Sequence, residues 1–212
     1  LSSGIDYRVP WIFDVIDSAE ALVAKPEITT IEELVGKTVA TPFASTAHFS
    51  LLAALDGAGV DPADVDIIDA APDDIYAAWT RGDIDAAYVW NPNLAKLIDD
   101  GGTVLITSAD LAELGATTYD LAIVSNSFAD EFPDAVEVWL AQQDRAVQLI
   151  HDDPAAAAEA VALELEITPE EAAAQLADLV FVTAADQIGP DYLGGGLAAN
   201  LLAAAEFNKA QG

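Results

Sequence analysis

The sequence predicts an α/β protein of two lobes, one of them discontinuous. Between residues 28 and 120, short β-branched segments alternate with short helical ones, which is typical of a mostly parallel sheet covered by helices. Beyond residue 120 the chain changes to consecutive helices rich in Ala and Glu, while the first 27 residues favour strands. We therefore expect residues 28–120 to form lobe 2, and residues 1–27 with 121–212 to form an incomplete lobe 1.

The first segments carry clear strand and helix signals. The β-branched and aromatic run YRVPWIFDVI predicts a strand, and EALVAK follows as a second one. Thr30 is a predicted N-cap with Glu33 as its capping-box partner, and Gly36 ends that short helix. KTVATP follows as a strand, and a helix is expected from Thr46 to Leu55.

The remaining elements follow in order. Strands are expected at DIIDA, IDAAYVW, TVLIT and TYDLAIVSNSF. Helices are expected at DDIYAAWTRGD, which Gly82 stops, and at NPNLAKLIDDGG, with Pro92 in its first turn. The last part of the chain is predicted to be helical at PDAVEVWLAQQDRAVQLIHDD, PAAAAEAVALELEI, TPEEAAAQLADLVF and NLLAAAEFNKAQ.

The composition excludes several classes of function. The 37 acidic residues against 7 basic ones give a net charge of −30, which argues against nucleic acid as a partner. The simplest interpretation of this acidity is a solvated, salt-tolerant surface. Cysteine is absent, which excludes disulfides and thiol chemistry, and His48 and His151 are too far apart for a histidine-rich metal site. We expect no metal and no cofactor.

Targeting signals are also missing from the printed sequence. It contains no stretch of eighteen apolar residues that would span a membrane. It opens with LSSGIDYRVPW, without Met and without a basic-then-apolar leader, so we expect a processed or truncated chain.

The stretch ATPFASTAHFSLLAAL, residues 40–55, predicts a site for an anion. A strand stops at a proline and a helix begins, and in open α/β sheets ligands bind where this happens. Unpaired amides and the helix dipole favour an anion there, Ser45 and Thr46 add hydroxyls, His48 adds a ring donor, and Ala47 lets a ligand approach. The alternative is that Ser45 or Thr46 only caps the helix and that His48 is structural.

The absence of Lys and Arg from this stretch favours a zwitterion over a bare anion, which a protein of charge −30 would repel. The cationic end of a zwitterion would need a carboxylate and an aromatic face. The candidates stand near strand ends: Trp90, Asp120, Glu20 and Asp14. The alternatives are ordinary packing for the tryptophan and surface positions for the acids.

Three stretches together carry a family resemblance: GKTVATPFASTAHFSLLAAL, AAWTRGDIDAAYVWNP and TTYDLAIVSNSFADEFPDAV. In order and spacing they resemble the taurine-binding proteins of ABC importers, within the sulfonate and nitrate group of periplasmic binding proteins. The resemblance implies a type II periplasmic binding fold whose α/β lobes are joined by two crossover strands, here near Leu22–Lys25 and Leu121–Val124, and solute capture by lobe closure. It also implies that the family's first βαβ portion and its final C-terminal segment are missing here.

The resemblance further implies the contacts of the ligand. The sulfonate would meet Ser45, Thr46, Ala47 and His48. The ammonium would meet Asp120, with Glu20 as a second acceptor and Trp90 as a wall. The partners would be an ABC permease with its ATPase, and the protein would be a periplasmic or extracytoplasmic monomer, with a lipoprotein anchor, if one exists, in a segment absent here.

Other functions stay open at this point. The ligand could be nitrate, a pyrimidine precursor or a betaine, and the fold also serves sensory domains. An enzyme could use Ser45 as nucleophile and His48 as base, but no G-x-S-x-G elbow surrounds Ser45. We therefore expect no catalytic residue.

Overall fold

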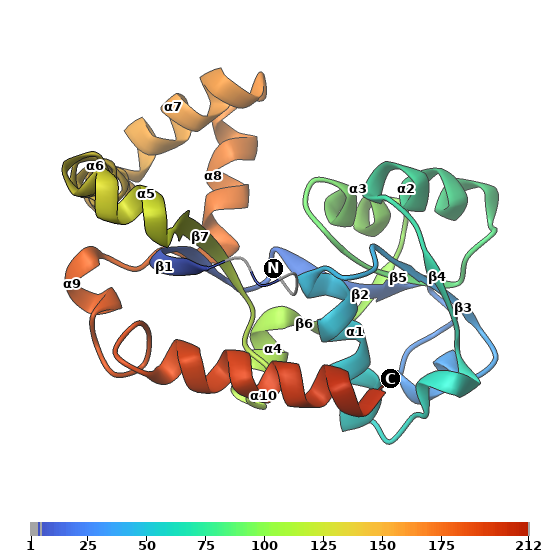
Figure 1. The fold of residues 1–212 in the computed structure, drawn as a ribbon. Helices are drawn as coiled ribbons and strands as arrows, with labels where there is room; N and C mark the ends of the chain where they lie inside the picture. Colours follow the sequence, from blue (N-terminus) through green and yellow to red (C-terminus); the bar gives the residue numbers. More distant parts are fainter. Residues whose placement is uncertain (1–3, 5, 212) are drawn as a thin grey trace. The chain divides into compact units, whose positions relative to one another are not determined.

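The computed structural model describes residue 4 and residues 6–211. They form two compact units, which we call unit 1 (residues 1–15 and 119–199) and unit 2 (residues 16–118 and 200–212) (Figure 1). The passage between the units therefore falls at residues 15/16 and 118/119, earlier than the lobe limits expected at 27/28 and 120/121. The last thirteen residues group with unit 2, whereas the sequence suggested lobe 1.

Unit 2 contains a five-stranded sheet in the order β4-β3-β5-β2-β6. Its strands are β2 (Glu20–Ala24), β3 (Thr38–Thr41), β4 (Asp66–Asp69), β5 (Ala86–Trp90) and β6 (Thr103–Thr107). Its helices are η1 (Glu32–Leu34), α1 (Thr46–Gly57), η2 (Pro62–Asp64), α2 (Pro72–Arg81), α3 (Asn93–Asp99) and α4 (Ser108–Glu113). The helix α10 (Gly196–Gln211) begins in unit 1 and continues in unit 2.

The sheet of unit 2 is mixed, which corrects the expectation of a mostly parallel sheet. β3 pairs with β4 and β5 in parallel, but β2 runs antiparallel to both of its neighbours, β5 and β6. All five residues of β2 are buried, so its sequence has no polar face that would indicate its place or direction. The segment 22–25, expected as a crossover strand, contains the last three residues of β2, which is an inner strand of this sheet.

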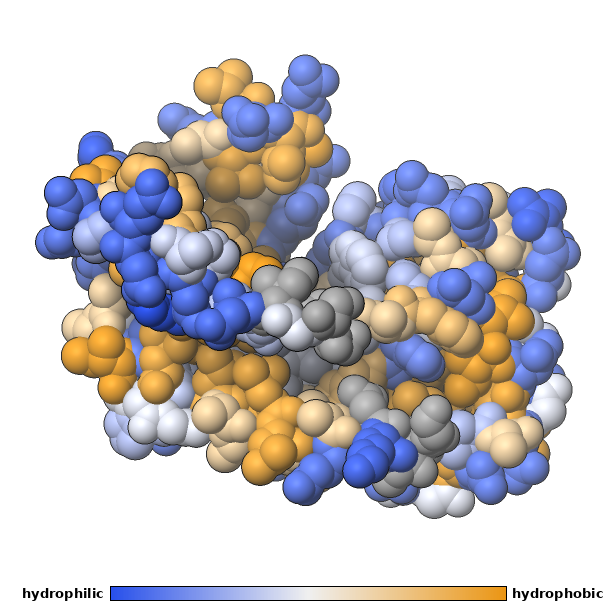
Figure 2. Space-filling model, viewed as in Figure 1, coloured by the Kyte–Doolittle hydropathy of each residue, from blue (hydrophilic) through white to orange (hydrophobic). Residues whose placement is uncertain are grey.

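Helices cover both faces of the unit 2 sheet (Figure 1). Alternate residues of β2 point to opposite faces, so Leu22 packs with Leu51 and Leu55 of α1, while Val23 packs with Trp79 of α2 and Leu97 of α3. The outer surfaces of α2 and α3 carry hydrophilic side chains (Figure 2). The strands packed between these helices end at the edge that carries the candidate site.

Unit 1 has a three-stranded sheet in the order β7-β1-β8 and a set of helices. Its strands are β1 (Tyr7–Ile16), β7 (Tyr119–Ser125) and β8 (Leu179–Val180). Its helices are α5 (Asn126–Glu131), α6 (Pro133–Asp152), α7 (Pro154–Leu165), α8 (Pro169–Ala177) and α9 (Ala184–Gln187). A small core joins Trp11 of β1, Ala122 of β7 and Val147 of α6.

Several local predictions are confirmed and some need correction. Helices α6, α7 and α8 are confirmed, each with proline in its first turn. Thr30 is not an N-cap, because η1 is a single turn that begins at Glu32, although the Glu33 carboxylate accepts the backbone N–H groups of Thr29 and Thr30 as a capping-box acid would. The strand expected through Phe128 ends at Ser125, whose hydroxyl caps α5.

Candidate ligand-binding site

One edge of the unit 2 sheet gathers the ends of four strands. β3, β4 and β5 are parallel, so their carboxyl ends share this edge, where Thr41 pairs with Asp69. Because β2 runs the other way, its first residue is at the same edge, and Glu20 lies opposite Trp90 in the register. Helix α1 begins five residues after β3, so its N-terminus belongs to this edge as well.

Ser45 is the N-cap of α1, as the capping interpretation predicted. Its backbone is extended (φ −103°, ψ 174°), its Oγ accepts the His48 N–H at 3.2 Å, and its hydroxyl donates to the Pro42 carbonyl at 2.6 Å. The Thr46 and Ala47 amides occupy the first two helical positions, where no acceptor exists within the helix. Together with the helix dipole, these two amides can hold an anion without a basic side chain.

Ala47 and His48 differ in what they can offer. Ala47 as a whole has no exposed surface and lies in the core beneath α1, so its methyl group offers no contact to a ligand. The His48 ring stacks on Phe43 at a centroid distance of 4.5 Å, and its Nδ1 accepts the Ala44 N–H at 3.4 Å. Burial lowers the pKa of His48, and the charge of Asp69 opposes that shift. From these contacts we assign a neutral ring with its proton on Nε2, which can donate to a ligand.

Thr46, Glu20 and Trp90 are brought together beside this turn. The Thr46 hydroxyl donates to Glu20 Oε1 at 2.5 Å, and the Ser108 hydroxyl donates to Glu20 Oε2 at 3.4 Å. Glu20 is only 3% exposed. It is therefore not a surface residue, which was the alternative that the many acidic residues of the sequence suggested. Trp90 is half-buried and packs against the core beneath α1, which supports the packing interpretation for part of its ring.

The other two predicted acids belong to unit 1. Asp14 of β1 and Asp120 of β7 are register partners on neighbouring antiparallel strands, so their side chains lie on the same face of that sheet. Asp14 is buried, whereas Asp120 reaches solvent but is surrounded by enough protein that desolvation raises the pKa of its carboxyl. Two carboxylates on one face can accept hydrogen bonds from an ammonium group.

Ser45 and His48 do not form a nucleophile and base. The Ser45 hydroxyl donates to a backbone carbonyl, the His48 ring accepts from the Ala44 amide, and the two residues contact each other through the His48 backbone N–H. Activation of a serine requires a ring nitrogen that accepts the hydroxyl proton. The arrangement therefore serves capping and orientation.

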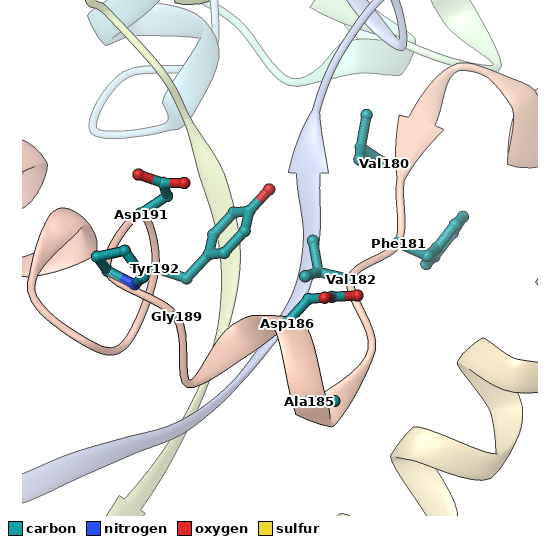
Figure 3. A pocket seen from close by; sticks show the side chains of 9 residues that line it. Val180, Phe181, Val182, Ala185, Asp186, Gly189, Asp191 and Tyr192 are labelled. Carbon is teal, nitrogen blue, oxygen red and sulfur yellow. The ribbon is translucent and has the colours of Figure 1, made fainter.

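The sequence did not indicate a pocket in unit 1 that lies around β8, α9 and the loop after α9 (Figure 3). It has a volume of about 480 Å³ and is lined by Val180, Phe181, Val182, Ala185, Asp186, Gly189, Pro190, Asp191 and Tyr192. Asp186 is engaged as an acceptor from the Thr183 hydroxyl at 2.7 Å. The run GPDYLGGG was the only signal of an irregular loop here.

Two further features are absent from residue 4 and residues 6–211. Within these residues, no group of His, Cys, Asp and Glu has an arrangement that could bind a metal ion. In the same part of the chain, none of the helices combines the length and apolar character needed to span a membrane.

Comparison with known proteins agrees with the fold. The chain is 45% identical over 124 residues to the taurine-binding periplasmic protein of Escherichia coli, and the match covers 58% of this chain but only 38% of that protein. The crystal structure of the periplasmic aliphatic sulphonate binding protein of E. coli superposes on 99% of this chain and 70% of its own, with a TM-score of 0.76 and 23% identity. A desulfurization enzyme also shares the fold, with a TM-score of 0.71, 16% identity, and coverage of 100% of this chain and 74% of its own.

These likenesses confirm the predicted periplasmic-binding-protein fold. The family described as NMT1/THI5-like matches residues 11–157, which is more than half of the 212 residues. The chain belongs to the NMT1/THI5-like family.

Proposed function

We propose that this chain is the ligand-binding part of an ABC importer component that captures taurine or a closely related zwitterionic sulfonate. The observation that carries the proposal is its 45% identity over 124 residues to a taurine-binding protein. The geometry of α1 supports the same ligand class, because a helix start with unpaired amides and no Lys or Arg can accept a sulfonate. A bare anion would have no counter-charge against the acidity of the protein.

In this proposal the two compact units are the two lobes, and each holds one end of the ligand. The amides of Thr46 and Ala47, with His48 Nε2 beside them, bind the sulfonate in unit 2. The carboxylates of Asp120 and Asp14 bind the ammonium in unit 1, with Trp90 as an apolar wall from unit 2. Closure of the lobes would remove both charged ends from water and strengthen their hydrogen bonds.

The remaining roles follow from this assignment. The partners would be a membrane permease and its ATPase, and the protein would act as a monomer outside the cytoplasm, with any lipid anchor in a segment outside this sequence. Neither a cofactor nor a catalytic residue is needed, because the output is the closed shape. The main alternative function is that of an enzyme, since a desulfurization enzyme has the same fold.

The test is calorimetric titration of the chain with taurine, propane-1-sulfonate, nitrate and glycine betaine. Taurine is expected to bind most tightly, and Asp120→Ala is expected to remove most of its advantage over propane-1-sulfonate. Equal affinity for the two sulfonates would refute ammonium recognition. Tighter binding of nitrate or betaine than of taurine would show that the ligand is not a zwitterionic sulfonate. Release of sulfite from taurine during incubation would favour the enzyme.

A further inference from the structure

Glu20 stands at the centre of a buried hydrogen-bonded chain in unit 2. Its two carboxylate oxygens accept the hydroxyls of Thr46 and Ser108, and Ser108 Oγ lies 3.0 Å from the Tyr88 hydroxyl. Ser108 and Tyr88 have no exposed surface, and Glu20 retains 3%. Burial chiefly, and the charge of Glu20 in part, raise the pKa of Tyr88 well above its usual range, so the phenol stays protonated. The chain therefore connects the first turn of α1 with the interior of the unit.

The Thr46–Glu20 contact has the length of a hydrogen bond to an ionised acid. An O–H···O distance of 2.5 Å is typical of a hydroxyl that donates to a carboxylate, whereas neutral hydroxyl pairs are longer. Thr46 and Ser108 are also the first residues of α1 and α4, so both hydroxyl donors stand at the N-terminal, positive ends of helices. These donors and dipoles together stabilise a buried negative charge at this position.

The contact has two consequences for the proposed sulfonate site. The Thr46 hydroxyl has a single proton, and it is used on Glu20, so this side chain holds the turn in place. The charge of Glu20 is also close to the Thr46 amide, because the carboxylate contacts Oγ1 of the same residue. A bare anion at that amide would be repelled, while a zwitterion would offer its ammonium to the same field.

We propose that Glu20 is a positioning and selectivity residue, which fixes Thr46 through its hydroxyl and biases the α1 site toward anions that carry their own cationic group. This inference rests on the proposed function of the α1 site. It gives Glu20 a role different from that of a second direct ammonium ligand, since its oxygens accept the hydroxyls of Thr46 and Ser108 and the residue is only 3% exposed.

The experiment compares taurine with propane-1-sulfonate, which replaces the ammonium by a methyl group of similar size. In Glu20→Gln, the ratio of the affinity for taurine to the affinity for propane-1-sulfonate is expected to fall by on the order of tenfold, mainly because propane-1-sulfonate binds more tightly. Thr46→Val is expected to weaken both ligands by the same factor and to leave the preference unchanged. Glu33→Gln is the matched control, since Glu33 also accepts hydrogen bonds at a short helix start in this unit but lies away from the α1 turn, and its preference should equal that of the unmodified protein.

A merely structural role of Glu20 would give a different result. Glu20→Gln would then lower the melting temperature and weaken both ligands equally, and a preference within twofold of the starting value would overturn the selectivity claim. The positioning claim is tested without ligand by the melting temperatures of Glu20→Gln, Thr46→Val and the double variant. A double variant less destabilised than the sum of the single ones supports it, and simple additivity overturns it. If the unmodified protein binds neither sulfonate, the proposed function and the selectivity claim fail together, while this cycle still decides the positioning role.

Discussion

Asp14 and Asp120 lie opposite each other on the antiparallel strands β1 and β7 of unit 1. Like charges at directly opposed positions of a sheet are unfavourable, and here Asp14 is also buried. Nothing in the backbone pairing requires acids at these two positions. An ammonium group bound between the two carboxylates would offset the desolvation that raises the pKa of Asp120, which supports the proposed position of the ligand's cationic end.

The first prediction concerns Asp120→Asn. Because desolvation raises the pKa of Asp120 in the folded protein, the charged form is disfavoured, and this group's contribution to stability is full below pH ~3.9 and lost as the pH rises through the raised pKa. At pH 7 the variant should therefore be slightly more stable than the unmodified protein, and the difference should vanish near pH 3. At the same time its affinity for taurine should fall, by on the order of tenfold or more.

Urea unfolding at the two pH values and titration with taurine check this prediction. Glu131→Gln changes an exposed carboxylate on α5 of the same unit and should alter neither property. A variant that loses stability at pH 7 would contradict the view that the Asp120 charge is held at a cost in the free protein.

The second prediction concerns Gln187, whose buried side chain replaces strand pairing along β1. Its Oε1 accepts the Ile12 N–H at 2.8 Å, and its Nε2 donates to the carbonyls of Ile12 and Val182 at 3.0 and 2.9 Å. Gln187→Leu keeps a side chain of similar size but leaves these backbone groups unpaired. The free energy of unfolding should fall by about 2–4 kcal/mol, measured by urea titration. Gln142→Leu, at an exposed position of α6, should change the free energy of unfolding by less than ~0.5 kcal/mol. Equal losses in the two variants would contradict a stabilising role of the Gln187 hydrogen bonds to β1.

Gln187 also shows where a sequence stops being informative. Its partner Ile12 is 175 residues away, and a single glutamine in a short helical segment has no local feature that indicates burial. The same limit applies to β2, because a fully buried five-residue strand gives no sign of its neighbours or direction. Both depend on pairings between distant segments.

Local signals in the sequence predict several elements correctly. The helices α6 to α8 follow from proline at the first turn and from Ala-rich and Glu-rich composition, and α1 begins at the residue that its Ser45 cap predicts. Helix α4 was missed although Thr107 and Asp110 form a capping box that the sequence displays. At the edge site, the turn was predictable, but the Thr46–Glu20 contact required knowledge of the register between β2 and β5.

The third prediction concerns two glycines of unit 2. A Cβ at Gly102 would lie 2.7 Å from the Leu97 carbonyl oxygen and 2.6 Å from Val23 Cγ2, so Gly102→Ala must displace backbone and should cost about 1–3 kcal/mol of stability. A Cβ at Gly57, in the last turn of α1, meets no atom within 4 Å, so Gly57→Ala should be neutral or should stabilise by up to ~1 kcal/mol. Urea midpoints measure both, and a Gly102→Ala variant as stable as Gly57→Ala would contradict the close packing of α3 on β2.

The fourth prediction concerns the pH dependence that His48 gives to stability. Burial lowers the pKa of His48 in the folded protein, so at pH values below ~6.5 the unfolded chain binds a proton that the folded protein resists. Stability should therefore be full above pH ~6.5 and should fall as the pH drops toward the lowered pKa. His48→Asn cannot take up this proton, so its urea midpoint should fall less between pH 7.5 and 5.5 than that of the unmodified protein. Because the charge of Asp69 raises the pKa of His48, Asp69→Asn should lower that pKa further, so the loss of stability should be larger and should extend to lower pH. Parallel curves for all three proteins would show that the ring does not titrate in this range.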